Sequence, residues 1–77
     1  MNISKEDIDF YKTKLGERIT ELRLKNGLSL RKLAIIADME HHQILNIESG
    51  KTDLRLSTIL KLSKALSVSP KDLLDTK

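Results

Sequence analysis

The sequence has no cysteine, a single proline and only two aromatic residues, Phe10 and Tyr11, among its 77 residues. The lack of cysteine excludes disulfide bonds, thiolate metal sites and cysteine nucleophiles. No apolar run approaches the roughly 20 residues that a membrane-spanning helix needs, and the polar, acidic N-terminus does not resemble a signal peptide. These absences predict one small cytoplasmic domain with no membrane segment.

Catalytic patterns are missing as well. The sequence contains no Gly-rich phosphate loop, no paired-carboxylate pattern and no nucleophile–base arrangement, and so short a chain leaves little room for a deep pocket. We therefore expect neither an enzyme nor a bound cofactor. The net charge of +3 is a weak indication of a polyanionic partner.

Helix start and stop signals divide the chain into five helical segments. Ser4 and Asp7 resemble a capping box, which predicts a first helix that begins at Lys5 and ends before Gly27. Further segments are expected after Ser29, from about 41 to 49, from about 56 to 66, and after Ser69–Pro70. Because no segment alternates with period two, the fold class is predicted to be all-α.

The region from residue 30 to residue 48 carries the pattern of a helix-turn-helix. Ala34 is the small residue over which a second helix can cross, and Asp38 stands where the turn needs a left-handed backbone. Ile44 and Ile47 then anchor the second helix from its inner face. Together, these four residues between two short helices predict a helix-turn-helix, a motif that reads DNA with its second helix.

The sequence from 15 to 74 resembles the Cro/C1-type (Xre-type) helix-turn-helix domains of phage repressors and bacterial regulators. Its most specific pieces are Leu22-Arg23, Gly27-Leu28-Ser29, Leu33-Ala34, Ile47-Glu48-Ser49-Gly50-Lys51 and Leu62-Ser63-Lys64-Ala65-Leu66. The resemblance implies a compact five-helix, lambda-repressor-like domain that forms a homodimer and places its third helix in the major groove of double-stranded DNA. Residues 1–14 would then be an N-terminal helical extension and 75–77 a C-terminal tail.

The third helix supplies the candidate base contacts. Helical periodicity turns Ile44 and Ile47 inward, which leaves on the outward and flanking faces His41, His42, Gln43 and Asn46. The resemblance matches His41, His42 and Asn46 to base-contact positions, with Gln43 nearby and a phosphate contact as its alternative. Because Asn and Gln pair with adenine N6 and N7, we expect an operator rich in A·T at the positions that are read.

Two adjacent histidines also fit a metal site or plain solvated surface. Side chains one residue apart diverge by about 100° on a helix, and the sequence offers no obvious third ligand. We therefore expect no metal ion, while DNA contact and solvated surface both stay open for His41 and His42.

Candidate phosphate contacts flank the third helix on both sides. The start of the second helix offers free N–H groups and a positive dipole end, together with Ser29, Arg31 and Lys32. The loop after the third helix contributes Lys51, Thr52 and Arg55. Each basic residue has solvated surface as its alternative role.

Structural roles follow from the resemblance and from residue chemistry. Arg23 and Glu48 would form a salt bridge that joins the first helix to the third, with direct DNA contact as the alternative for Arg23. The dimer surface of such domains corresponds here to Leu66, Val68, Leu73 and Leu74. Phe10 and Tyr11 are expected to pack on the domain's own core, with a dimer contact as the alternative.

The sequence thus predicts a sequence-specific transcriptional regulator of the repressor, controller or antitoxin type. Three departures from the family pattern weaken tight binding: Leu30 stands in place of the usual Gln, Glu40 in place of a Ser or Thr cap, and Leu54-Arg55 in place of Pro-Ser. The Leu30 and Glu40 departures and the neutral charge of the motif lend weight to the alternative of a protein-interaction module, such as a toxin-binding antitoxin, with a toxin or an antirepressor as partner and weak or auxiliary DNA binding.

Overall fold

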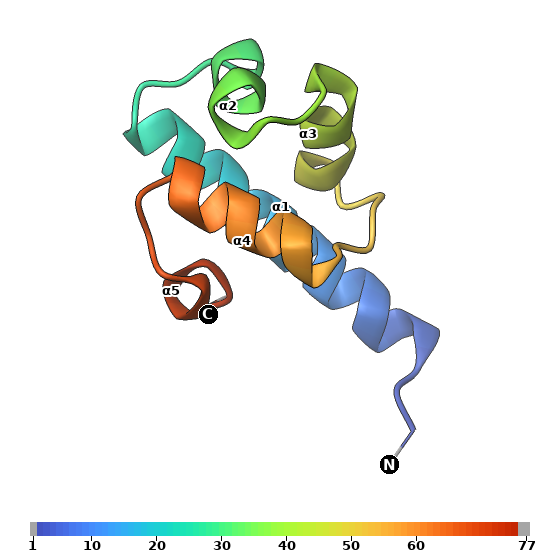
Figure 1. The fold of residues 1–77 in the computed structure, drawn as a ribbon. Coiled ribbons are helices and arrows are strands. Elements are labelled where there is room, and N and C mark those ends of the chain that lie inside the picture. The colour runs from blue at the N-terminus through green and yellow to red at the C-terminus, as the bar shows by residue number, and fades with distance from the viewer. Residues whose placement is uncertain (1, 76–77) are drawn as a thin grey trace.

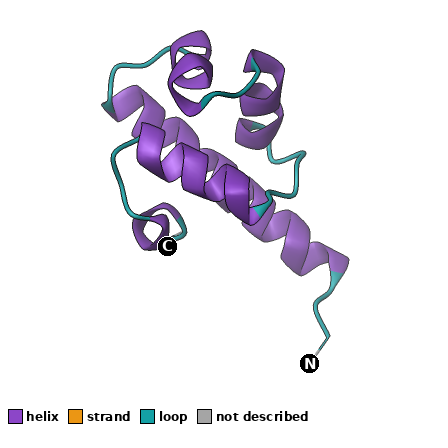
Figure 2. Cartoon of the chain, in the orientation of Figure 1, coloured by secondary structure: helices purple, strands orange, loops and turns teal. Residues whose placement is uncertain are grey.

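Five helices make up the fold in the computed structural model, which describes residues 2–75. They are α1 (Lys5–Lys25), α2 (Leu30–Ala37), α3 (His41–Glu48), α4 (Leu56–Ala65) and α5 (Pro70–Leu73). Within the described residues there is no strand (Figure 2), and no helix there is long and apolar enough to cross a membrane. The predicted all-α class and the five segments are confirmed. Residues 76 and 77 of the predicted tail, and Met1 of the predicted extension, lie outside the described residues.

Hydroxyl caps begin three of the helices where the sequence predicts them. The Ser4 hydroxyl accepts the Asp7 N–H at 3.1 Å, and the Asp7 carboxylate accepts the Ser4 N–H at 3.3 Å, which completes the capping box. Ser29 and Ser69 cap α2 and α5 in the same way, by accepting N–H groups three residues later.

Left-handed residues end four of the helices. After α1, Gly27 has φ +69° and the Leu28 N–H donates to the Arg23 carbonyl at 3.0 Å, the bond of a Schellman ending. Gly50 ends α3 with φ +74°, and Asp38 ends α2 with φ 55°, as its position in the turn predicts. Ser67, with φ 59°, ends α4 in the same conformation; this strained position was not predicted.

The apolar core lies between the helices; in the view of Figure 1, α2 and α3 lie above α1 and α4, and α5 lies below them. α1 contacts α3 and α5, while α4 contacts α2 and α5. Each helix contributes apolar side chains that are less than a tenth exposed: Leu15, Ile19, Leu22, Leu33, Ala34, Ala37, Ile44, Ile47, Leu62, Leu66 and Leu73. The packing fixes α3 against the long α1.

The N-terminal half of α1 departs from the prediction. It extends past the other helices (Figure 1), and the core begins only at Leu15. Phe10 and Tyr11 are therefore 54% and 60% exposed, so the expectation that they pack on the domain's own core is wrong. They stack edge to face on each other, with ring centroids 5.2 Å apart.

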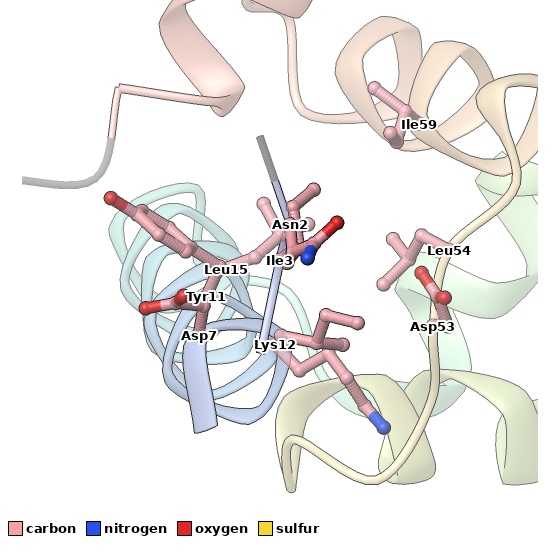
Figure 3. A pocket seen from close by; sticks show the side chains of 10 residues that line it. Asn2, Ile3, Asp7, Tyr11, Lys12, Leu15, Asp53, Leu54 and Ile59 are labelled. Carbon is pink, nitrogen blue, oxygen red and sulfur yellow. The ribbon is translucent and has the colours of Figure 1, made fainter. Parts of the chain in front are cut away.

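An open hollow of about 670 Å³ separates this part of α1 from the loop before α4. Figure 3 shows Ile3 on one side of it and Leu54 and Ile59 on the other, with the Tyr11 ring pointing away from both. Ile3 and Ile8, which line the hollow on the α1 side, are 70% and 41% exposed.

Two residues assigned to a dimer surface belong to the core. Leu66 is 1% exposed and Leu73 is fully buried, and both belong to the hydrophobic core cluster. Neither side chain has surface left to offer a partner, which corrects the prediction for this pair. Val68 is half-buried and Leu74 is 49% exposed.

Candidate nucleic-acid interface

The turn between α2 and α3 follows the predicted helix-turn-helix pattern. Ala34 is 3% exposed, and its carbonyl accepts the Met39 N–H at 2.9 Å across the left-handed Asp38. Ile44 is fully buried and Ile47 is 3% exposed, so both anchor the inner face of α3 as predicted. A small residue, one strained turn position and two anchors thereby set the crossing of the two helices.

A glycine on α1 sets how closely α3 approaches, and the sequence analysis missed it. A Cβ atom on Gly16 would lie 2.5 Å from the Ile47 carbonyl oxygen and 2.8 Å from that of Glu48. No side chain fits there, so the last turn of α3 rests directly on the backbone of α1. An isolated glycine inside an otherwise helical, apolar-periodic segment was the signal that could have revealed this contact.

Arg23 and Glu48 tie the same two helices together. The Arg23 Nε and Nη2 groups donate to the two carboxylate oxygens of Glu48 at 2.7 and 3.0 Å, while Nη1 donates to the Leu28 carbonyl at 2.8 Å. The side chains are 12% and 9% exposed. The predicted salt bridge is therefore formed, and with all three donor groups engaged, Arg23 fits a structural role rather than DNA contact.

The outward face of α3 carries the candidate base contacts. His42 and Gln43 are exposed, while His41 and Asn46 are half-buried. The two imidazole rings lie edge to face with centroids 6.4 Å apart. In residues 2–75 no three His, Cys, Asp or Glu side chains gather closely enough to hold a metal ion.

Gln43 also caps the start of α3. Its side-chain Oε1 accepts the Glu40 N–H at 2.9 Å, which satisfies a backbone donor that the helix start would otherwise leave free. The amide oxygen is thus engaged and only the NH₂ group remains for DNA. Bidentate reading of adenine requires both groups, so Asn46 is the better placed of the two amides for it.

One shallow hollow brings base and phosphate candidates together. It measures about 400 Å³ and lies between α3 and the start of α4. Gln43 and Asn46 line its α3 side, and Thr52 and Arg55 line its other side, together with Thr58 and the carboxylate of Asp53. Asp53 and Thr58 were not predicted, and nothing in their spacing distinguishes them from ordinary loop and helix residues.

The other phosphate candidates lie apart from this hollow. Arg31 and Lys32 are exposed on the first turn of α2, where the Ser29 hydroxyl accepts the Lys32 N–H at 3.0 Å. Lys51 is exposed directly after Gly50, in the loop that leaves α3. A Cβ on Gly50 would lie 3.1 Å from the Thr13 Cα, so this loop begins in close contact with α1.

Basic residues supply the positive charge around a neutral recognition helix. Within 29–55 four Lys or Arg residues balance four Asp or Glu residues, namely Arg31, Lys32, Lys51 and Arg55 against Asp38, Glu40, Glu48 and Asp53. Since Glu48 is held by Arg23 inside the domain, its charge does not face the surface of α3. The arrangement offers hydrogen-bonding groups on α3, with exposed cations at the start of α2 and in the segment that follows α3.

Comparison with known proteins places this geometry among DNA-binding domains. A family model described as "Helix-turn-helix domain" matches residues 16–77. Control protein C.BamHI from Bacillus amyloliquefaciens is 44% identical over 61 residues, which cover 78% of this chain and 75% of that protein. The HTH-type transcriptional regulator PuuR from Escherichia coli is 37% identical over 54 residues, 70% of this chain and 29% of PuuR.

A solved structure shows the same fold over nearly its whole length. The restriction-modification controller protein C.AhdI from Aeromonas hydrophila matches with a TM-score of 0.79 and 35% identity. The match covers 80% of this chain and 94% of that one. The portion of the present chain outside it is small.

Proposed function

This chain belongs to the helix-turn-helix domain family, and on that premise we propose that it is a transcriptional regulator that reads double-stranded DNA by placing α3 in the major groove. The observation that carries the proposal is the split between the two faces of α3. Ile44 and Ile47 lock its inner face, while His41, His42 and Asn46 present hydrogen-bonding groups outward from its first two turns. Such groups at the N-terminal end of a rigid recognition helix are suited to base edges.

Affinity comes in this proposal from the cations around α3. Arg31 and Lys32 at the start of α2, and Lys51 and Arg55 in the segment after α3, are all exposed. Phosphate contacts fix the position of a protein on the duplex, while base contacts specify the sequence. In the proposed complex the neutral α3 contacts the bases, and the basic residues outside it contact the phosphates.

Among regulators, we propose a controller of a restriction–modification system. The proposal is supported by two relatives that are 35% identical or more and match over 75% and 94% of their own length, since these bear the names of control or controller proteins. PuuR matches over less than a third of its length, so its other parts have no counterpart in the comparison. A regulator that acts on DNA would work in the cytoplasm.

A two-fold homodimer completes the proposed function. Leu74 and Val68 remain from the surface that the sequence predicted, since Leu66 and Leu73 are core residues. A dimer would set its two recognition helices about 34 Å apart, one turn of DNA, on a pseudo-palindromic operator. Sedimentation of the purified chain measures the oligomeric state directly, and Leu74→Glu is expected to shift it toward monomer.

Selection from random duplexes tests the proposal as a whole. We expect a pseudo-palindromic consensus with half-sites about one helical turn apart. Binding that falls with salt but yields no consensus would contradict sequence-specific regulation. For the controller assignment, the selected site should occur upstream of the restriction and modification genes next to the chain's own gene.

A further inference from the structure

The recognition helix carries one apolar side chain that the core does not use. Of the three aliphatic residues of α3, Ile44 and Ile47 are at most 3% exposed, whereas Leu45 is 41% exposed. Leu45 lies one turn after His41 and His42, at the four- and three-residue spacings that make neighbours on a helix surface. It therefore belongs to the same outward face as the candidate base contacts.

The direction of the side chain strengthens this placement. Helix side chains tilt toward the N-terminus of their helix, so the isobutyl group of Leu45 covers the turn that holds His41 and His42. That turn is the part of a recognition helix that reaches base edges. In the proposed complex, Leu45 would leave water and face the floor of the major groove.

Only one group in the major groove matches an aliphatic side chain. Base edges there present hydrogen-bond donors and acceptors, with the C5-methyl group of thymine as the apolar exception. Leucine can satisfy no donor or acceptor, so it would desolvate a polar edge without compensation. A thymine methyl instead buries apolar surface on both partners.

We infer that Leu45 selects thymine in each half-site by contact with its C5-methyl group. The inference rests on the proposed placement of α3 in the major groove and deepens it. It also agrees with the A·T preference expected from Asn46. Asn46 would thereby recognise adenine by hydrogen bonds, and Leu45 would recognise thymine by apolar contact, both from the outward face of α3.

Replacement of thymine by uracil isolates the methyl group, because the two bases pair identically. Affinity is measured on the selected operator and on versions with single thymine-to-uracil changes, at one salt concentration. For the unaltered protein we expect a loss of about fourfold at one thymine per half-site, the effect of one buried methyl group. Elsewhere in the site uracil should change the affinity little.

Three variants assign the effect to the side chain. Leu45→Ala should bind the thymine and uracil operators equally, and Leu45→Met should keep a preference for thymine. Leu24→Ala removes a leucine that is 62% exposed at the end of α1, so it is the matched control and should keep the full discrimination. The half-exposed position and the high helix propensity of alanine favour a folded Leu45→Ala protein.

Two results would overturn the inference and leave the proposed function standing. One is equal affinity of the unaltered protein for the thymine and uracil operators at every position. The other is unchanged discrimination in Leu45→Ala. Failure to select any operator would instead contradict the proposed function, and the inference with it.

Discussion

The guanidinium of Arg23 donates two hydrogen bonds, of 2.7 and 3.0 Å, to the carboxylate of Glu48, and so joins the last turn of α1 to the last turn of α3. Both side chains are mostly buried, and the third donor group of Arg23 holds the Leu28 carbonyl. Together with the close contact at Gly16, the pair fixes the orientation of α3 from its C-terminal end, opposite the turn proposed to meet DNA.

Arg23→Ala should leave the buried carboxylate of Glu48 without its ion-pair partner. We expect the free energy of unfolding to fall by roughly 3 kcal/mol, because Glu48 is then left charged and little exposed. Urea denaturation measures the change. The control is Glu17→Gln, which breaks an exposed pair with Lys14 whose atoms are 3.9 Å apart and should cost no more than about 0.5 kcal/mol. Similar small losses in both variants would contradict a structural role for Arg23.

Gly16→Ala should force α1 and α3 apart. The added Cβ would meet the Ile47 and Glu48 carbonyls at 2.5 and 2.8 Å, and backbone atoms there cannot swing aside. We expect a loss of about 2–3 kcal/mol in stability, together with weaker binding of the selected operator by the protein that remains folded.

The control for Gly16 is Gly27→Ala. Nothing lies within 4 Å of a Cβ at Gly27, whose φ is +69°, so the cost there is only the left-handed conformation, about 1 kcal/mol. The affinity of the folded Gly27→Ala protein for the selected operator should stay unchanged. An equal effect of the two substitutions on DNA binding would remove the proposed steric role of Gly16.

How far the sequence predicts this fold is clearest at the ends of its helices. The cap at Ser4 and the stops at Gly27, Asp38 and Gly50 depend on local chemistry, so they could be predicted residue by residue. The left-handed Ser67 could not, because serine has no preference for that conformation.

Contacts between helices were harder to predict than the helices themselves. Ile44 and Ile47 could be placed in the core from periodicity. Leu66 and Leu73 were misassigned to a dimer surface, since an apolar pattern does not tell an internal partner from an external one. The prediction for Phe10 and Tyr11 was wrong in the opposite sense, since they were expected in the core and are exposed. The apolar periodicity continues along α1 beyond the point where other helices cover it.

Ser67→Gly should stabilise the protein. A non-glycine residue at φ 59° carries a steric cost of about 1–2 kcal/mol, and glycine removes it at the expense of somewhat greater freedom in the unfolded chain. We expect a net gain of about 0.5 kcal/mol in urea denaturation. Ser67 lies between α4 and α5, so operator affinity should not change; a loss of stability would contradict this reading of the turn.

Lys51→Gln should weaken binding to every duplex by a similar factor. A phosphate contact carries no sequence information, and its loss should lower the slope of log affinity against log salt by about one for each chain bound. Lys71→Gln removes the same charge from the exposed surface of α5 and is the matched control. An unchanged slope in Lys51→Gln would place this lysine in solvent rather than on DNA.

Base recognition by α3, as distinct from phosphate contact by the cations outside it, is tested most directly by a ratio of two affinities. These are the affinities for the selected operator and for a scrambled duplex, measured at one salt concentration. Asn46→Ala should lower that ratio by roughly 5- to 150-fold, because a bidentate base contact is worth about 1–3 kcal/mol of discrimination. Lys51→Gln should leave the ratio almost unchanged while both affinities fall. A ratio unaffected by Asn46→Ala would contradict the assignment of base recognition by Asn46 on the outward face of α3.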